Sequence, residues 1–99
     1  MNTASYHISD DPWGAVVAAN DDVLKEVANT MKWRPYNSMH EAYAVLAEEV
    51  DEFWDEVRKK ARNRNTKDAY KELIQIAAIA TAYAAQIKEE DDGRDSGTT

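Results

Sequence analysis

The stretch that decides the fold is residues 39–61, MHEAYAVLAEEVDEFWDEVRKKA. Apolar side chains recur in it with the three- and four-residue spacing of one face of an α-helix. These residues are Met39, Tyr43, Leu46, Val50, Phe53 and Val57. Ser38 and Glu41 have the S-x-x-E form of a capping box, and the basic residues at the end complement the helix dipole. The pattern predicts an amphipathic helix from about residue 39 to residue 61.

A first helix is expected before this stretch, within residues 13–33, after an irregular arm at residues 1–12. Apolar residues recur at helical spacing in its second half, and residues 20–22 (NDD) suit an N-terminal turn. Pro35 disfavours helical backbone at the residue before it. We therefore expect the first helix to end in the loop that precedes Ser38.

A third helix is expected after a short polar break, from a cap at Asn65 or Thr66 to about Glu90. Its centre, LIQIAAIATAYAA (73–85), is apolar almost all round, and such helices are usually buried on every side. Residues 91–99 are predicted to form a flexible polar tail. A chain of 99 residues has too few other helices to cover this centre. The expected fold is an all-α bundle of three to four helices that assembles into a dimer or tetramer.

Composition limits the classes of protein that this chain can belong to. It has no cysteine and no apolar run of the roughly 20 residues that span a bilayer, and because its first residues lack a basic and an apolar region we expect no secretory signal. We therefore expect one soluble cytoplasmic domain at residues 13–90. The net charge of −7 disfavours a general nucleic-acid surface. Residues 58–71 nevertheless hold seven basic residues and one acidic residue, either as a solvated helix end or as contacts for a polyanionic small molecule.

Six of the twelve residues in 46–57 are acidic, and on a helical wheel they divide into two groups. Glu48, Asp51 and Asp55 point away from the apolar stripe. Glu49, Glu52 and Glu56 share one edge of it. Carboxylates at i and i+3 repel unless a cation lies between them, and hard divalent ions accept such oxygen ligands. A solvated acidic edge is the simpler alternative.

The third helix strengthens the metal hypothesis. Glu72 is its only acidic residue between Lys71 and Lys88, and it lies where the apolar centre begins. Two antiparallel helices joined by a short loop would bring Glu72 towards Glu49 and Glu52. These residues form E-x-x-E at 49–52 and E-x-x-Q at 72–75, which is not the E-x-x-H pattern of di-iron bundles.

The segments HEAYAVLAEEVDEFWDEVRKK (40–60) and YKELIQIAAIATAYA (70–84) resemble MazG-like members of the all-α NTP pyrophosphatase superfamily. They are most similar to the compact single-domain forms of phages and mobile elements. The family pattern is E-E-x-x-E, a spacer, and then E-x-x-D. Four acids match it: Glu48, Glu49, Glu52 and Glu72. Gln75 stands where the family has Asp.

The resemblance implies a hydrolase that converts a (d)NTP to a (d)NMP and pyrophosphate, with Mg²⁺, or alternatively Mn²⁺, as cofactor. Glu49, Glu52 and Glu72 would ligate the metal, with Gln75 as a weak fourth ligand. Glu49 or Glu52 would orient or deprotonate the attacking water. Gln75 favours an alternative, a non-catalytic helical assembly that binds nucleotides or a protein partner. A third possibility is an acidic mimic of DNA, against which the basic segment at 58–71 argues.

Three residues are predicted to contact the substrate. Lys71, adjacent to Glu72, and Arg58, near the acidic edge, are the candidates for the triphosphate, although surface solubility is the simpler role for either. Trp33, in the loop before residue 39, is the candidate for stacking on the base. Trp54 is expected in the core or in a subunit interface.

Overall fold

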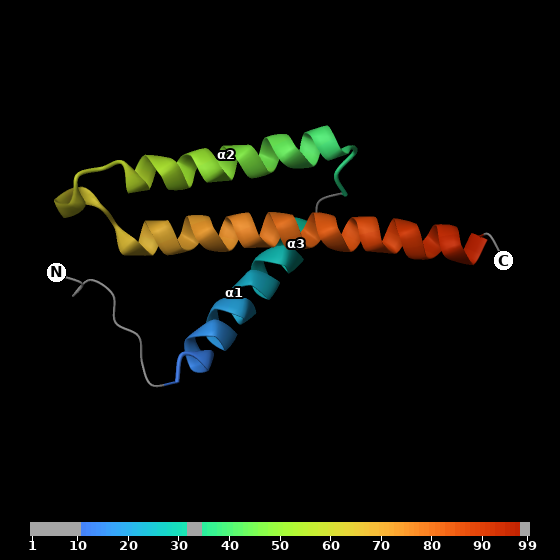
Figure 1. The fold of residues 1–99 in the computed structure, drawn as a ribbon, viewed down its shortest axis with the longest axis horizontal. Helices are drawn as coiled ribbons and strands as arrows, with labels where there is room; N and C mark the ends of the chain where they lie inside the picture. The colour runs from blue at the N-terminus through green and yellow to red at the C-terminus, as the bar shows by residue number, and fades with distance from the viewer. Residues whose placement is uncertain (1–10, 32–34, 98–99) are drawn as a thin grey trace.

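The computed structural model describes residues 11–31 and 35–97. In these residues the regular secondary structure is entirely helical. The elements are α1 (Trp13–Met31), α2 (Met39–Val57), a short 3₁₀ helix η1 (Ala61–Asn63) and α3 (Thr66–Gly97). Figure 1 shows α2 lying antiparallel beside α3, while α1 crosses α3 obliquely. The all-α fold predicted from the sequence is confirmed for the described residues.

The long helix α3 is the centre of the molecule. Both α1 and α2 pack against it, and within the described residues α1 and α2 do not pack against each other. The two shorter helices therefore cover different sides of α3 (Figure 1). No helix in the described ranges is long and apolar enough to cross a membrane.

Helix α1 begins earlier than the sequence indicated. A carboxylate oxygen of Asp11 accepts a hydrogen bond from the Trp13 backbone N–H at 3.1 Å, and Pro12 suits the first turn because it has no N–H to leave unpaired. The helix lies within the predicted range of residues 13–33, but residues 20–22, expected to form its N-terminal turn, lie in the middle of it. The cap at Asp11 and the Ala/Val-rich segment after it allow the helix to begin at Trp13, before the NDD segment.

The capping box of α2 forms with one modification. The Ser38 hydroxyl accepts the Glu41 N–H at 3.0 Å, as predicted. The Glu41 carboxylate reaches past Ser38 and accepts the Asn37 N–H at 2.7 Å. The helix ends at Val57, before the predicted end at Ala61, and η1 follows it.

Helix α3 is capped by Asn65 rather than by Thr66. The Asn65 side-chain oxygen accepts hydrogen bonds from the backbone N–H groups of Lys67 at 2.9 Å and Asp68 at 3.2 Å. At its other end α3 continues to Gly97, beyond the predicted end at Glu90.

The buried apolar core of the described residues is small. It consists of Ala42 on α2 and of Ala78, Ile79 and Ala82 on α3. Alanine has little side chain, so these positions let the helices approach closely. The large apolar side chains of α2 are divided: some face α3, whereas four remain exposed along one stripe. The exposed residues are Met39, Tyr43, Val50 and Trp54.

Part of α3 lies beside this stripe. A shallow pocket of about 250 Å³ joins Met39 and Tyr43 to Ala80 of α3. Leu73 lies seven residues before Ala80, therefore on the same helix face, and it is also exposed. We call Met39, Tyr43, Val50, Trp54 and Leu73 the open face of the α2–α3 hairpin.

Candidate metal centre

Three glutamates from two helices converge between α2 and α3. Glu49 and Glu52 lie one turn apart on α2, and Glu72 lies near the start of α3. One carboxylate oxygen from each residue lies within 4.8 Å of the others. Glu49 and Glu72 are partly buried, and Glu52 is exposed. We call these three residues the carboxylate triad.

The antiparallel hairpin creates this convergence. Glu72 is twenty or more residues away from the other two glutamates in the chain, and only the turn through η1 returns α3 along α2. The expectation that Glu72 approaches Glu49 and Glu52 therefore agrees with the geometry. Their role as metal ligands stays a prediction.

The triad concentrates negative charge. Burial, a hydrogen bond with Glu72 and the charges of Glu52 and Glu72 raise the pKa of Glu49 to about 7. The pKa of Glu52 is also raised, by desolvation and by the charge of Glu72. Among the described residues, no Lys or Arg forms an ion pair with any of the three. Protons or an added cation would relieve the repulsion between them.

The donor set fits a small hard cation. Mg²⁺ binds oxygen ligands at about 2.1 Å in an octahedron, so two protein oxygens on one ion lie at most about 4.2 Å apart. The triad oxygens lie within 4.8 Å of one another, which modest side-chain rotations would reduce to that range. Mg²⁺ sites usually combine one or two carboxylates with water and substrate phosphates. The triad offers one carboxylate more than this usual number, and its exposed member leaves one side open to water and phosphate.

Glu56, on the same predicted edge of α2, is used differently. It is 6% exposed, and its carboxylate accepts the Asn65 backbone N–H at 2.5 Å and a hydrogen bond from the Lys59 ammonium at 2.8 Å. These partners hold its pKa below the usual range, with the Lys59 bond as the larger cause. Glu56 therefore joins the end of α2 to the start of α3 and fixes the hairpin that positions the triad.

The outward acids are exposed, as the helical wheel of residues 46–57 predicted, and Arg58 pairs with one of them. Glu48, Asp51 and Asp55 are exposed. Arg58 forms an exposed ion pair with Asp55 at 3.0 Å. Its predicted contact with a triphosphate stays a prediction, and Asp55 is its partner in this structure.

Two basic side chains of residues 58–71 bond to other parts of the chain instead of standing free to bind an anion. Lys59 is paired with Glu56, and the Arg64 guanidinium donates from Nε to the Val57 carbonyl at 3.0 Å. The Arg64 bond closes the loop between α2 and α3. For these two side chains the structure shows bonds within the chain, and whether residues 58–71 contact a polyanionic molecule stays a prediction.

Lys71 and Gln75 flank Glu72 on α3 and line a pocket of about 310 Å³ between α1 and α3. We call it the α1–α3 pocket. From α1 it is lined by Asp22, Lys25 and Glu26. The predicted ligand role of Gln75 is untested by this placement. Trp33 lies outside the described residues.

The sequence did not indicate the contribution of α1 to this region. The Tyr70 hydroxyl donates a hydrogen bond to the Asp22 carboxylate at 2.5 Å, across the crossing of α1 and α3. This bond raises the pKa of Tyr70. No periodicity signals such a pair, because it depends on the angle and register at which α1 crosses α3.

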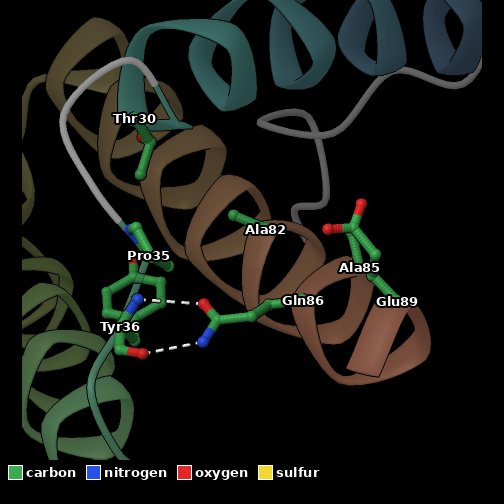
Figure 2. Close-up of a pocket in the computed structure, with 7 residues that line it drawn as sticks. All are labelled: Thr30, Pro35, Tyr36, Ala82, Ala85, Gln86 and Glu89. Atoms are coloured by element: carbon green, nitrogen blue, oxygen red, sulfur yellow. Dashed lines mark hydrogen bonds between the residues drawn. The ribbon is translucent and has the colours of Figure 1, made fainter. Parts of the chain in front are cut away.

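A third pocket, of about 250 Å³, is lined by the segment before α2 and by the second half of α3 (Figure 2). In Figure 2 the Gln86 amide accepts the Tyr36 N–H at 2.9 Å and donates to the Tyr36 carbonyl at 2.7 Å. The Tyr36 ring also meets Tyr83 edge to face, with ring centroids 5.7 Å apart. Gln86 is separated from Glu72 by about 21 Å at 1.5 Å per helical residue. These contacts attach the segment before α2 to α3 and are remote from the triad.

Comparison of the chain with protein-family models, with curated proteins and with solved structures finds no match.

Proposed function

We propose that this chain is a Mg²⁺-dependent nucleoside triphosphate pyrophosphohydrolase of the MazG-like type, with the carboxylate triad as its metal centre. One observation carries the proposal: three carboxylates from α2 and α3 meet, and no Lys or Arg of the described residues forms an ion pair with them. The order of these acids along the chain matches the MazG-like pattern at Glu49, Glu52 and Glu72.

The residues of the triad would bind the metal ion and activate the attacking water. Glu49, Glu52 and Glu72 would hold Mg²⁺, or alternatively Mn²⁺, through one oxygen each. When bound, the ion supplies charge neutralisation and a more acidic water. One of Glu49 and Glu52 would orient the attacking water and accept its proton. The water oxygen bonds to the α-phosphorus, the bond from that phosphorus to the α–β bridging oxygen breaks, and pyrophosphate leaves.

The test is pyrophosphate release from a panel of natural and modified dNTPs with Mg²⁺. Glu49→Gln and Glu52→Gln keep side-chain size and remove the charge, so each should lower kcat by about a hundredfold or more. Asp51→Asn, an exposed acid between them on α2, is the matched control and should retain activity. Activity that survives both glutamate substitutions contradicts the proposed site.

A second copy of the chain is the proposed partner for the open face. Its five apolar side chains are 44–71% exposed, and in the part of the chain that the structure describes the buried apolar core is limited to four small or medium residues. Pairing two α2–α3 hairpins through this face would produce a four-helix bundle and cover the apolar centre of α3. This agrees with the expectation of a homodimer or homotetramer.

Gln75 favours a second candidate function, a helical assembly that binds nucleotides or a protein partner without turnover. A neutral amide is a weaker ligand for Mg²⁺ than a carboxylate. If the wild type releases no pyrophosphate and Gln75→Asp gains hydrolysis, this second function is the correct one.

A further inference from the structure

Adjacent residues of α3 belong to two different sites. Glu72 lies in the carboxylate triad with two residues of α2. Lys71, Ile74 and Gln75 line the α1–α3 pocket. Residues at i and i+3 of a helix have Cβ atoms about 5–6 Å apart. The α1–α3 pocket is therefore the immediate neighbour of the triad, and a ligand held at the triad by its phosphates has this pocket within reach.

The charges around the pocket do not favour a polyphosphate. Lys25 and Lys71 contribute two positive charges, and Asp22 and Glu26 contribute two negative charges. The hydroxyl of Tyr70 is held by Asp22, which fixes the orientation of its ring, and the residue is 44% exposed. An oriented aromatic ring beside Ile74, in surroundings of zero formal charge, suits an uncharged flat group.

Gln75 has an uncommitted amide in this pocket. Its side chain forms no hydrogen bond with any other described residue, although it is partly buried. By contrast, Gln86 has both ends of its amide bonded to Tyr36. A glutamine amide offers one acceptor and two donor hydrogens, the same groups that the edges of nucleobases present.

We propose that the α1–α3 pocket binds the nucleobase, with Tyr70 stacking on the ring and Gln75 bonding to its edge. This inference rests on the proposed function. It assigns Gln75 to recognition of the substrate instead of the metal. The metal does not need a fourth protein ligand, because Mg²⁺ usually takes its remaining ligands from water and phosphate.

The experiment separates metal binding from base binding. Calorimetry measures the affinity of Mg²⁺ alone and, in Mg²⁺ buffer, the affinities of the four α,β-imido dNTPs, which resist cleavage at the α–β position. Gln75→Leu removes the amide at similar size. It should leave the affinity for Mg²⁺ within about twofold, and it should weaken the best-bound nucleotide by about tenfold, as loss of a hydrogen bond or two predicts. The differences among the four bases should shrink.

Substitutions of Tyr70 give a second, independent test of base binding. Tyr70→Phe keeps the stacking ring but loses the hydrogen bond to Asp22 that orients it, so it should weaken nucleotide binding less than Tyr70→Ala does. Tyr70→Ala should weaken all four analogues, because stacking tolerates any base. Thr81→Val, at an exposed position of α3 outside the pocket, is the control for a lost polar group. Circular dichroism establishes that each variant is folded before binding is measured.

The possible results distinguish this inference from the proposed function. A loss of Mg²⁺ affinity in Gln75→Leu without a change in base preference overturns the inference and makes Gln75 a metal ligand. Unchanged nucleotide binding in both Gln75→Leu and Tyr70→Ala also overturns it, even if the wild type hydrolyses dNTPs. If the wild type releases no pyrophosphate but Gln75→Leu alters base preference, the inference stands and the hydrolytic function fails.

Discussion

Glu56 and the triad show how carboxylates on one helix acquire opposite properties. Glu56 has two donors, the Asn65 N–H and the Lys59 ammonium, and its pKa is lowered. Glu49 has carboxylates as neighbours, and its pKa is raised. Much of the difference comes from residues that follow α2 in the chain: Lys59 and Asn65 beside Glu56, and Glu72 beside Glu49. A helical wheel of α2 alone therefore places both glutamates on one edge but cannot separate their roles.

The lowered pKa of Glu56 makes it a source of acid sensitivity. A carboxyl group whose folded pKa lies below its unfolded value of 4.5 stabilises the fold above that value and loses this effect as the pH falls through the folded pKa. Glu56→Gln should lower Tm at neutral pH, and the difference from wild type should shrink in acid. Thermal unfolding followed by circular dichroism between neutral and acidic pH checks this. A difference that is constant with pH contradicts it.

The raised pKa of Glu49 has the opposite effect on the pH dependence of stability. Between 4.5 and about 7 the folded protein binds more protons at this position than the unfolded chain, so stability falls as the pH rises through this window. Glu49→Gln should flatten the decline in Tm over the same window. Glu48→Gln, at an exposed neighbouring position, should not.

Addition of Mg²⁺ should raise Tm more above the pKa of Glu49 than below it, because the ion binds carboxylates that have lost their protons. At a free concentration a hundred times Kd, one site stabilises the fold by about 2.7 kcal/mol. Differential scanning calorimetry with and without Mg²⁺ measures the shift. An equal shift in Glu49→Gln and wild type would show that the ion binds elsewhere.

At the scale of elements, the sequence predicted the helices better than their ends. The period of residues 39–57 and the Ser38 cap identified α2, because these signals are local. The start of α1 was missed, because the NDD segment inside the helix offers the same kind of N-cap residues as Asp11 does. The crossing of α1 over α3, and with it the Tyr70–Asp22 pair, depends on tertiary packing that no single segment encodes.

The cap of α3 offers a test at this scale. Asn65 accepts two backbone N–H groups through its side chain. Asn65→Ala should reduce the free energy of unfolding by about 1 kcal/mol, the usual cost of losing an N-cap. Thr66→Ala, at the next residue, is the control and should cost less. Urea denaturation of both variants gives the comparison, and equal losses would contradict the role of the Asn65 side chain.

At the scale of the whole molecule, the exposed apolar surface governs the expected assembly. The centre of α3, apolar almost all round, indicated from the sequence that one chain leaves surface uncovered, but the location of that surface required the fold. It depends on which side of the α2–α3 hairpin α1 covers.

Substitution on the open face tests the proposed pairing of two chains. Trp54→Glu places a charge in the middle of the face and should convert the assembly to monomers, with a lower Tm. Trp13→Glu is the matched control, because Trp13 is an exposed tryptophan on α1, outside the open face. Light scattering coupled to size-exclusion chromatography measures the mass of each species. A monomeric wild type, or a Trp54→Glu variant of unchanged mass, contradicts the pairing.

The two short helices pack on α3 and, in the described residues, not on each other. Hydrogen exchange of the backbone amides measures how easily each helix unfolds locally. If α1 detaches from α3, the α2–α3 hairpin loses none of its own contacts, so α1 can open as a separate cooperative unit. Exchange into deuterated water should therefore label α1 before the buried turn around Ala78. Because the α1–α3 pocket includes residues of α1, a nucleotide bound there would slow exchange in a helix that contributes nothing to the carboxylate triad.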